Sequence, residues 1–185
     1  MERIAKTLFE ACIEDDIPAV EIILDKFPEL LETEDSSGNT PFLMASAHQS
    51  FGAMNQLIKL GANTKAVNSE GCTALIQSTK SRHSNFWVTT LILDNGGKSS
   101  INALDKSGRS ALYLAASNNN MNVAWDLINN GANVNLRCGT EQKSFTPLMG
   151  AVEKKHEAMV NLLLENGSNP NLFNDDGKNM SKILP

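Results

Sequence analysis

The most informative pattern in the chain is a periodic succession of short apolar segments separated by polar segments that contain glycine. A small polar residue followed by an apolar run recurs at nearly constant spacing. These runs start at Thr40, Thr73, Ser110, Thr146 and, in degenerate form, Asn179, with steps of 33, 37, 36 and 33 residues. A period of a few tens of residues is typical of arrays in which each unit packs only against its neighbours.

The residues within each period predict two short helices. Thr40 and Thr146 can cap the first helix through their hydroxyls, and the proline that follows each one suits the first helical position. A Leu/Ile pair about 17 residues after each start marks the second helix. Gly61, Gly131 and Gly167 come next and can adopt the positive φ that ends a helix.

The polar segments between the helix pairs are rich in turn-forming residues. Asp, Asn, Ser and Gly dominate 35–40, 68–73 and 105–110 and predict β-hairpin-like connections. One helix pair cannot bury its own apolar faces, so neighbouring units must share a core. We expect Phe42, Leu75, Leu112 and Leu148 to belong to that core. The predicted fold class is all-α, a solenoid of stacked helix-turn-helix units.

The repeated segments resemble ankyrin repeats over nearly the whole chain. The matching segments are TPFLMAS (40–46) with QLIKLGAN (56–63), SALYLAA (110–116) with DLINNGANVN (126–135), and TPLMGAV (146–152) with NLLLENGSNPN (161–171). Residues 8–32 look like an N-terminal unit that lacks its hairpin. The resemblance implies an ankyrin-repeat solenoid whose units are joined by β-hairpin-like loops.

The expected organisation is a single ankyrin-repeat domain over residues 1–185. Its units are 1–34 (N-terminal and cap-like), 35–67, 68–104, 105–140, 141–173 and 174–185 (incomplete). The third unit carries insertions near 81–87 and 96–103, and a further insertion lies near 136–144. The last unit stops after about one helix turn, either because the native chain ends there or because the sequence was cut from a longer protein.

The resemblance also implies a function, which is non-enzymatic binding of another protein through the concave face and the hairpin tips. The residues at the corresponding positions are Asn39, His48, Glu70, Lys80, Lys106, Arg109, Tyr113, Asn118, Lys143, Phe145 and Lys154. The central and later ones are mainly basic and surround Phe145, which suits an acidic segment of a partner around one aromatic anchor. The alternative for any single charge is that it only solvates the array.

Charge is unevenly distributed along the chain. Residues 1–35 hold eleven acidic and three basic residues, a net charge of −8, whereas 36–185 hold ten acidic and thirteen basic residues, a net charge of +3. The total of −5 offers no general attraction to phosphate, so we do not expect nucleic acid as a partner. No apolar run approaches the about 20 residues of a membrane span, and the N-terminus lacks a signal-like apolar core. We expect a cytoplasmic monomer that does not bind membranes.

The cysteines and histidines do not form a recognisable chemical motif. Cys12, Cys72 and Cys138 include no CxxC pair and no zinc-like cluster, so no metal or cofactor is expected. Cys72 lies in a predicted hairpin tip, where we expect the most accessible thiol, and His83 is a conceivable base for it. Because no third group or oxyanion donor accompanies them, no catalytic residue is predicted.

Some alternatives stay open at this point. The chain is expected to be a scaffold, an adaptor or an inhibitor, or alternatively a targeting domain cut from a larger effector or enzyme. Asparagine is abundant, with 21 of 185 residues, which fits an AT-rich genome and a host-directed bacterial effector acting in the host cytosol. We expect Trp125 and the Phe86-Trp87 pair to pack against neighbouring helices, and exposed contacts are the alternative.

Overall fold

The computed structural model describes residues 1–81, 84–140 and 143–172, and the predicted incomplete unit 174–185 lies outside this part. Helices follow one another in pairs along the chain. The pairs are α1 (Glu2–Glu14) with α2 (Ile17–Lys26), α3 (Pro41–His48) with α4 (Phe51–Lys59), α5 (Ala74–Thr79) with α6 (Phe86–Asp94), α7 (Ala111–Ser117) with α8 (Met121–Asn129), and α9 (Pro147–Glu153) with α10 (Glu157–Glu165). Below, the first to fifth units are the predicted ranges 1–34, 35–67, 68–104, 105–140 and 141–173.

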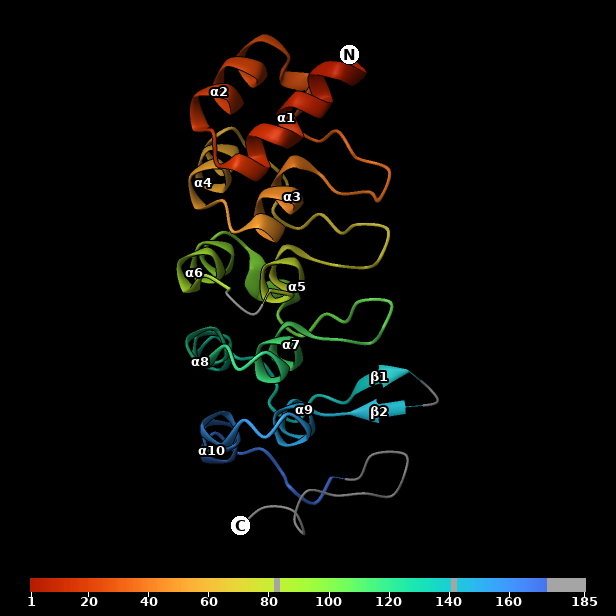
Figure 1. Ribbon diagram of the computed structural model, residues 1–185, viewed down its shortest axis with the longest axis vertical. Helices are drawn as coiled ribbons and strands as arrows, with labels where there is room; N and C mark the ends of the chain where they lie inside the picture. The colour runs from red at the N-terminus through yellow and green to blue at the C-terminus, as the bar shows by residue number, and fades with distance from the viewer. Residues whose placement is uncertain (82–83, 141–142, 173–185) are drawn as a thin grey trace.

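The helix pairs stack into two columns. The odd-numbered helices form one column and the even-numbered helices from α2 to α10 form the other, and the loops between units project from the side of the odd-numbered column (Figure 1). We call the odd-numbered helices inner, the even-numbered helices outer, and the projecting loops fingers. The fold is an all-α repeat solenoid, as the sequence predicts.

Short 3-10 and strand elements complete the description. The 3-10 turns are η1 (Pro28–Leu30) after α2 and η2 (Gly97–Ser100) after α6. Strands β1 (Cys138–Thr140) and β2 (Lys143–Phe145) pair antiparallel, with Cys138 opposite Phe145. This two-stranded ladder lies at the predicted insertion, so the extra residues lengthen one finger into a regular hairpin.

The predicted helix starts are confirmed by their capping hydrogen bonds. The hydroxyls of Thr40 and Thr146 each accept a hydrogen bond from the backbone amide three residues further along the chain, at 3.3 Å in both units. Thr73 and Ser110 cap α5 and α7 in the same way. Each cap satisfies an amide at a helix N-terminus that has no partner within the helix.

The predicted helix ends are confirmed as well. Gly61, Gly131 and Gly167 have φ values of 89°, 92° and 86° and follow the outer helices α4, α8 and α10. This left-handed conformation costs glycine little, because it has no Cβ to collide with the backbone. The chain can therefore leave each outer helix and turn toward the next finger.

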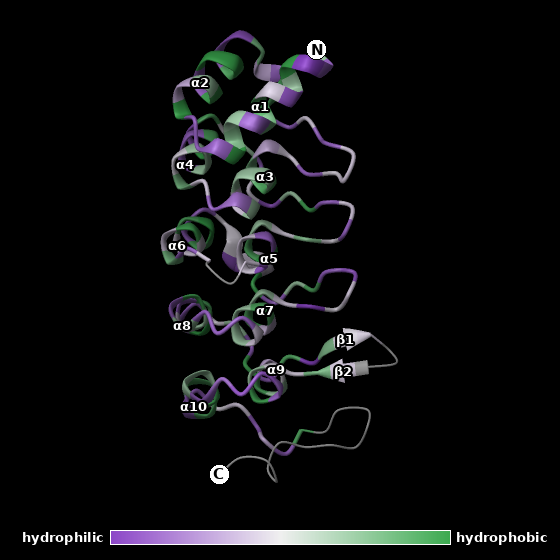
Figure 2. Ribbon diagram, viewed as in Figure 1, coloured by the Kyte–Doolittle hydropathy of each residue, from purple (hydrophilic) through white to green (hydrophobic). Residues whose placement is uncertain are grey.

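The core runs along the stack between the two columns. The predicted core residues Phe42, Leu75, Leu112 and Leu148 are all buried, one in each inner helix from α3 to α9. Hydrophobic residues gather on the helices, while the finger loops are largely hydrophilic (Figure 2). None of the helices in the described part of the chain is long and apolar enough to cross a membrane.

Candidate functional site: the inner face and its fingers

Three of the fingers are each held in shape by one residue near the start of the loop. The Oδ1 atoms of Asp35, Asn68 and Asp105 each accept two backbone amide hydrogen bonds from residues two and four positions further on, at 2.8–3.0 Å. An Asp or Asn side chain that satisfies nearby amides stabilises a turn. The fingers are therefore ordered projections.

Backbone hydrogen bonds also link each finger to the next. The amide of Ser69 donates to the carbonyl of Ser37, and the amide of Lys106 donates to the carbonyl of Glu70, both at 2.9 Å. The amide of Gly139 donates to the carbonyl of Gly108 at 2.7 Å. The fingers and the inner helices thus form one continuous surface, which we call the inner face.

Arg109 does not extend freely from its finger. Its guanidinium donates to Oδ2 of Asp105 through Nε at 2.9 Å and through a terminal nitrogen at 2.8 Å. The Asp105 side chain is only 1% exposed, so Arg109 neutralises a buried carboxylate. The sequence groups Arg109 with the free basic contacts, whereas the structure gives it a role inside the finger.

Asn39 and Asn118 also bond within the array. Oδ1 of Asn39 accepts from Asn68 at 2.8 Å and from Gln77 at 2.9 Å, so Asn39 connects the second unit to the third. Nδ2 of Asn118 donates to the carbonyls of Thr79 and Lys80, at 3.1 and 3.2 Å. Both side chains are half-buried and stabilise the stacking of units.

The electrostatics of the first finger follow from the same bonds. Burial by itself would raise the pKa of Asp35, but the hydrogen bonds from the Asn39 side chain and from the amides of Asn39 and Ser37 outweigh burial. The pKa of Asp35 is therefore below its usual value. The Asp35 carboxylate is thus stabilised in its charged form.

Two aromatic side chains meet on the inner face. The rings of Tyr113, on α7, and Phe145, at the end of β2, have centroids 4.2 Å apart and planes inclined at 33°. Gly150 on α9 makes room for this arrangement, because a Cβ at that position would lie 2.9 Å from Cε2 of Tyr113. Both aromatic residues remain half-buried, so part of each is accessible from solvent.

The other predicted contact residues differ in how far they reach solvent. His48, Glu70, Lys80, Lys106 and Lys154 are exposed. The backbone of Lys143 forms part of β2, but its side chain lies outside what the structure describes. The sequence reasoning missed Gly150 and the Asp105–Arg109 pair, although the four-residue spacing of Asp105 and Arg109 was a visible signal.

The expectation of an accessible thiol at Cys72 is wrong. Cys72 is 0% exposed, because it directly precedes the cap of α5 at the base of the finger. Cys12 and Cys138 are buried too. The pKa of Cys12 is raised to about 12, mainly by burial and to a lesser extent by the negative charge of Asp15. His83 lies outside the described residues. Within the described ranges, no three His, Cys, Asp or Glu side chains are grouped so that they could hold a metal ion.

The outer helices present a different surface. Trp125 is 54% exposed, so about half of the residue is buried, whereas Trp87 is 65% exposed. Phe86 is half-buried, and its ring centroid lies 5.4 Å from that of Trp87, with the planes inclined at 65°. The expected packing role therefore fits Phe86 but is wrong for Trp87. Trp87 lies in the first turn of α6 and is mostly exposed to solvent.

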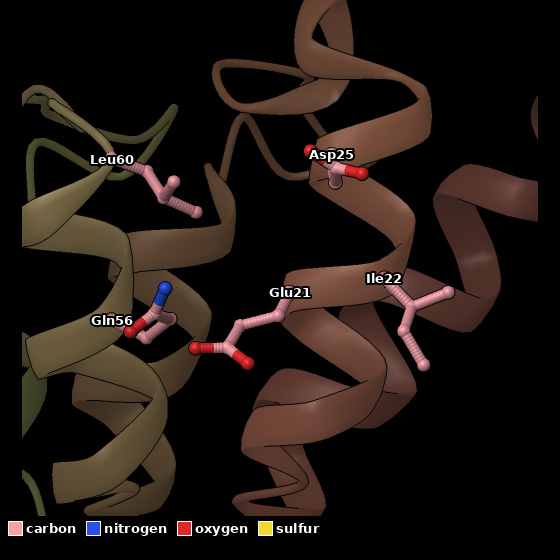
Figure 3. Close-up of a pocket in the computed structure, with 5 residues that line it drawn as sticks. All are labelled: Glu21, Ile22, Asp25, Gln56 and Leu60. Atoms are coloured by element: carbon pink, nitrogen blue, oxygen red, sulfur yellow. The ribbon is translucent and has the colours of Figure 1, made fainter.

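A shallow groove lies between two of the outer helices. It has a volume of about 360 Å³ and is lined by Glu21, Ile22 and Asp25 of α2, by Gln56 of α4 and by Leu60 just after it. Glu21 points toward Gln56 across the groove, whereas Ile22 points away from α4 (Figure 3). This groove is acidic, in contrast to the basic residues on the inner face of the later units.

Comparison with known proteins identifies the repeat type. A family model described as ankyrin repeats (3 copies) matches residues 85–174. The chain is also similar to neurogenic locus notch homolog protein 1 of Danio rerio, with 32% identity over 145 residues, or 78% of this chain. The chain spans only 5% of the length of that relative.

Proposed function

This chain is an ankyrin repeat protein, and from that premise we propose that it binds another protein through its inner face, with Tyr113 and Phe145 as the anchor. Ankyrin repeats are protein–protein interaction modules, a class of domain that is generally non-catalytic. The observation that carries the proposal is the paired aromatic rings, held between α7 and β2 and still accessible. Preordered aromatic side chains contribute strongly to interfaces, because little conformational entropy is lost when they bind.

The charge around the anchor favours an acidic segment of the partner. Lys80, Lys106 and Lys154 are exposed in the third, fourth and fifth units. They flank the aromatic pair along the inner face and carry charge that attracts carboxylates. Arg109 is left out of this set, because its guanidinium already pairs with Asp105.

The remaining parts of the proposal concern cellular role. We place the chain in the cytoplasm as a monomeric, non-enzymatic scaffold, adaptor or inhibitor. The alternative is a targeting domain of a larger effector or enzyme, including a host-directed bacterial effector. The chain matches a short part of a much longer relative, which supports this alternative. In either case we propose the inner face as the binding surface.

Quantitative affinity capture from the native cell tests the proposal. Tyr113→Ala should remove the partner retained by the wild-type chain, because truncating an interface anchor commonly costs about 2 kcal/mol or more. Combined Lys80→Glu and Lys154→Glu should weaken retention and make the remaining binding less sensitive to salt. Trp125→Ala, on an outer helix, is the matched control and should retain the partner.

Identical capture by the wild type and the Tyr113→Ala variant would reject the inner face as the binding surface. Circular dichroism melting of each variant separates lost binding from lost folding.

A further inference from the structure

The backbone bonds between fingers reveal an open position at the first finger. Ser69 and Lys106 directly follow Asn68 and Asp105, and each donates its amide hydrogen to a carbonyl of the preceding finger at 2.9 Å. Ser36 holds the same position after Asp35. No described residue accepts a hydrogen bond from the Ser36 amide, and Ser36 is exposed. A donor that binds a peptide carbonyl in later fingers is thus free in the first finger.

A groove lies beside this free amide. Its volume is about 550 Å³, and it runs between α1 and the first finger. The lining residues are Glu2, Arg3, Ala5, Lys6, Phe9, Glu34, Asp35 and Ser36. The space is therefore bordered both by side chains of the first inner helix and by the finger that carries the free amide.

The floor of the groove is less covered than the same place in the next unit. Phe9 and Leu43 hold equivalent positions in the first and second units. Each lies six residues before the residue with positive φ that ends its inner helix, Asp15 and Gln49 respectively. Leu43 is completely buried, whereas Phe9 is only half-buried. Phe9 lines the groove, so the exposed part of its ring is accessible there.

The charge of this region favours a basic occupant. The groove has carboxylates from Glu2, Glu34 and Asp35, and its two cations are Arg3 and Lys6. The ammonium of Lys6 lies 3.7 Å from the carboxylate of Glu10, which offsets its charge. Residues 1–35 as a whole carry a net charge of −8, so the first unit attracts positively charged segments.

We propose that this groove binds an extended basic segment of a partner protein, which takes the place of a preceding finger. One carbonyl of the segment accepts a hydrogen bond from the Ser36 amide, as the fingers do from one another. An aliphatic side chain or stem covers Phe9, and a Lys or Arg head lies near Glu34. Strand-like addition of this kind combines main-chain hydrogen bonds with side-chain selection. The site is separate from the Tyr113–Phe145 anchor.

Ser36→Pro removes the proposed donor with little disturbance of the finger. The amide of Gly38 donates to the carbonyl of Asp35 at 2.9 Å, which places Ser36 second in a four-residue turn. Proline is favoured at that position of a turn, so the melting temperature should stay close to the wild-type value. The matched variant Ser69→Pro removes an amide that is already bonded to Ser37 and should lower the melting temperature.

Binding is measured by fluorescence anisotropy with two labelled hexapeptides, one alternating lysine and valine and one alternating glutamate and valine. The lysine peptide should bind the wild-type chain, and the glutamate peptide should not. Ser36→Pro should weaken binding by about two- to ten-fold, the effect of one net hydrogen bond. Glu34→Lys should weaken it through charge, and Tyr113→Ala should leave it unchanged.

Hydrogen exchange followed by NMR gives a direct readout at the proposed donor. The Ser36 amide should become protected when the lysine peptide is added, while the amide of Glu70 serves as an internal reference. The proposal is overturned if the lysine peptide does not bind, if both peptides bind equally, or if Ser36→Pro binds as the wild type does. Loss of binding in Tyr113→Ala would move the peptide to the inner-face anchor and also overturn it.

Discussion

The third and fourth units have the same pair of helices but bury different side chains. The second half of α5 buries Gln77, Ser78 and Thr79, whereas α7 buries the apolar residues at 114–116. In the outer helices, α6 buries Thr89 at the place where α8 buries Ala124. Neighbouring units therefore share a backbone, while the second half of the inner helix buries polar side chains in one and apolar side chains in the other.

The third unit tolerates this interior because most of its polar atoms have partners. The hydroxyls of Ser78 and Thr79 donate to the Leu75 carbonyl at 2.9 and 3.0 Å, and Gln77 donates to Asn39 in the preceding unit. Thr89 is the exception, since its Oγ1 is buried without a partner among the described residues. The comparison teaches that the repeat fixes helix positions, whereas hydrogen-bond satisfaction decides how polar a unit can be.

The largest expected effect is a cavity in the apolar interior of the fourth unit. Leu127→Ala should lower the free energy of unfolding by about 2–5 kcal/mol, because Leu127 is completely buried. Urea unfolding followed by circular dichroism measures the change.

Leu162→Ala is the control for Leu127→Ala. Leu162 is partly exposed, and the buried member of its pair is Leu163. The Leu162 variant should therefore lose less stability, and equal losses would contradict the assigned burial.

The next effect concerns the charged finger of the fourth unit. The third unit has the neutral residues Asn68 and Cys72 where the fourth has Asp105 and Arg109. Arg109→Ala leaves the buried Asp105 carboxylate without its cation and should cost about 1–3 kcal/mol. Thermal and urea unfolding measure the loss. Lys106→Ala, in the same finger but exposed, should change stability by no more than about 0.5 kcal/mol.

A gain in stability is expected from removing the unpartnered hydroxyl of the third unit. Thr89→Val keeps the shape of the side chain and replaces a buried Oγ1 that has no partner in the described structure. The free energy of unfolding should rise by about 1 kcal/mol. A loss of stability, measured in urea, would show that the hydroxyl is satisfied in solution and would weaken the contrast between the units.

The smallest effect is a pH dependence at the boundary between the two units. Asp126 on α8 accepts a hydrogen bond from Thr90 on α6 at 3.0 Å. The pKa of Asp126 is raised above its ordinary value, mainly by burial and further by the charge of Asp94. The hydrogen bonds from Thr90 and Asn130 and the charge of Lys98 act in the opposite direction. The folded state therefore holds the proton of the Asp126 carboxyl group more tightly than the unfolded state does. The stability that this protonation contributes is present below the unfolded pKa and is lost as pH rises through the folded pKa.

Asp126→Asn should remove this contribution. Unfolding of the wild type and the variant in urea at about pH 4 and about pH 7 measures it. The wild type should lose more stability than the variant between the two pH values, and parallel changes would exclude Asp126 as the source.

The features that the sequence predicted are those encoded locally. The caps at Thr40 and Thr146 and the helix-ending glycines depend on a few consecutive residues, and the buried leucines depend on a repeated spacing. The errors concern side chains whose direction is set by the surroundings. Cys72 follows a turn that looks exposed but lies at the base of its finger, and Trp87 shares an apolar dipeptide with Phe86 but faces the solvent.

The sequence by itself determined where the inner helices begin, where the outer helices end and which repeated apolar residues are buried, because capping, helix ending and periodic burial are properties of short segments. The tertiary structure decided which polar groups remain available for partners. It pairs Arg109 with Asp105, uses Asn39 to join two units, and leaves the Ser36 amide without an acceptor in the described residues. The physical reason is that hydrogen bonds between units depend on how neighbouring fingers are placed in space, which no single repeat specifies.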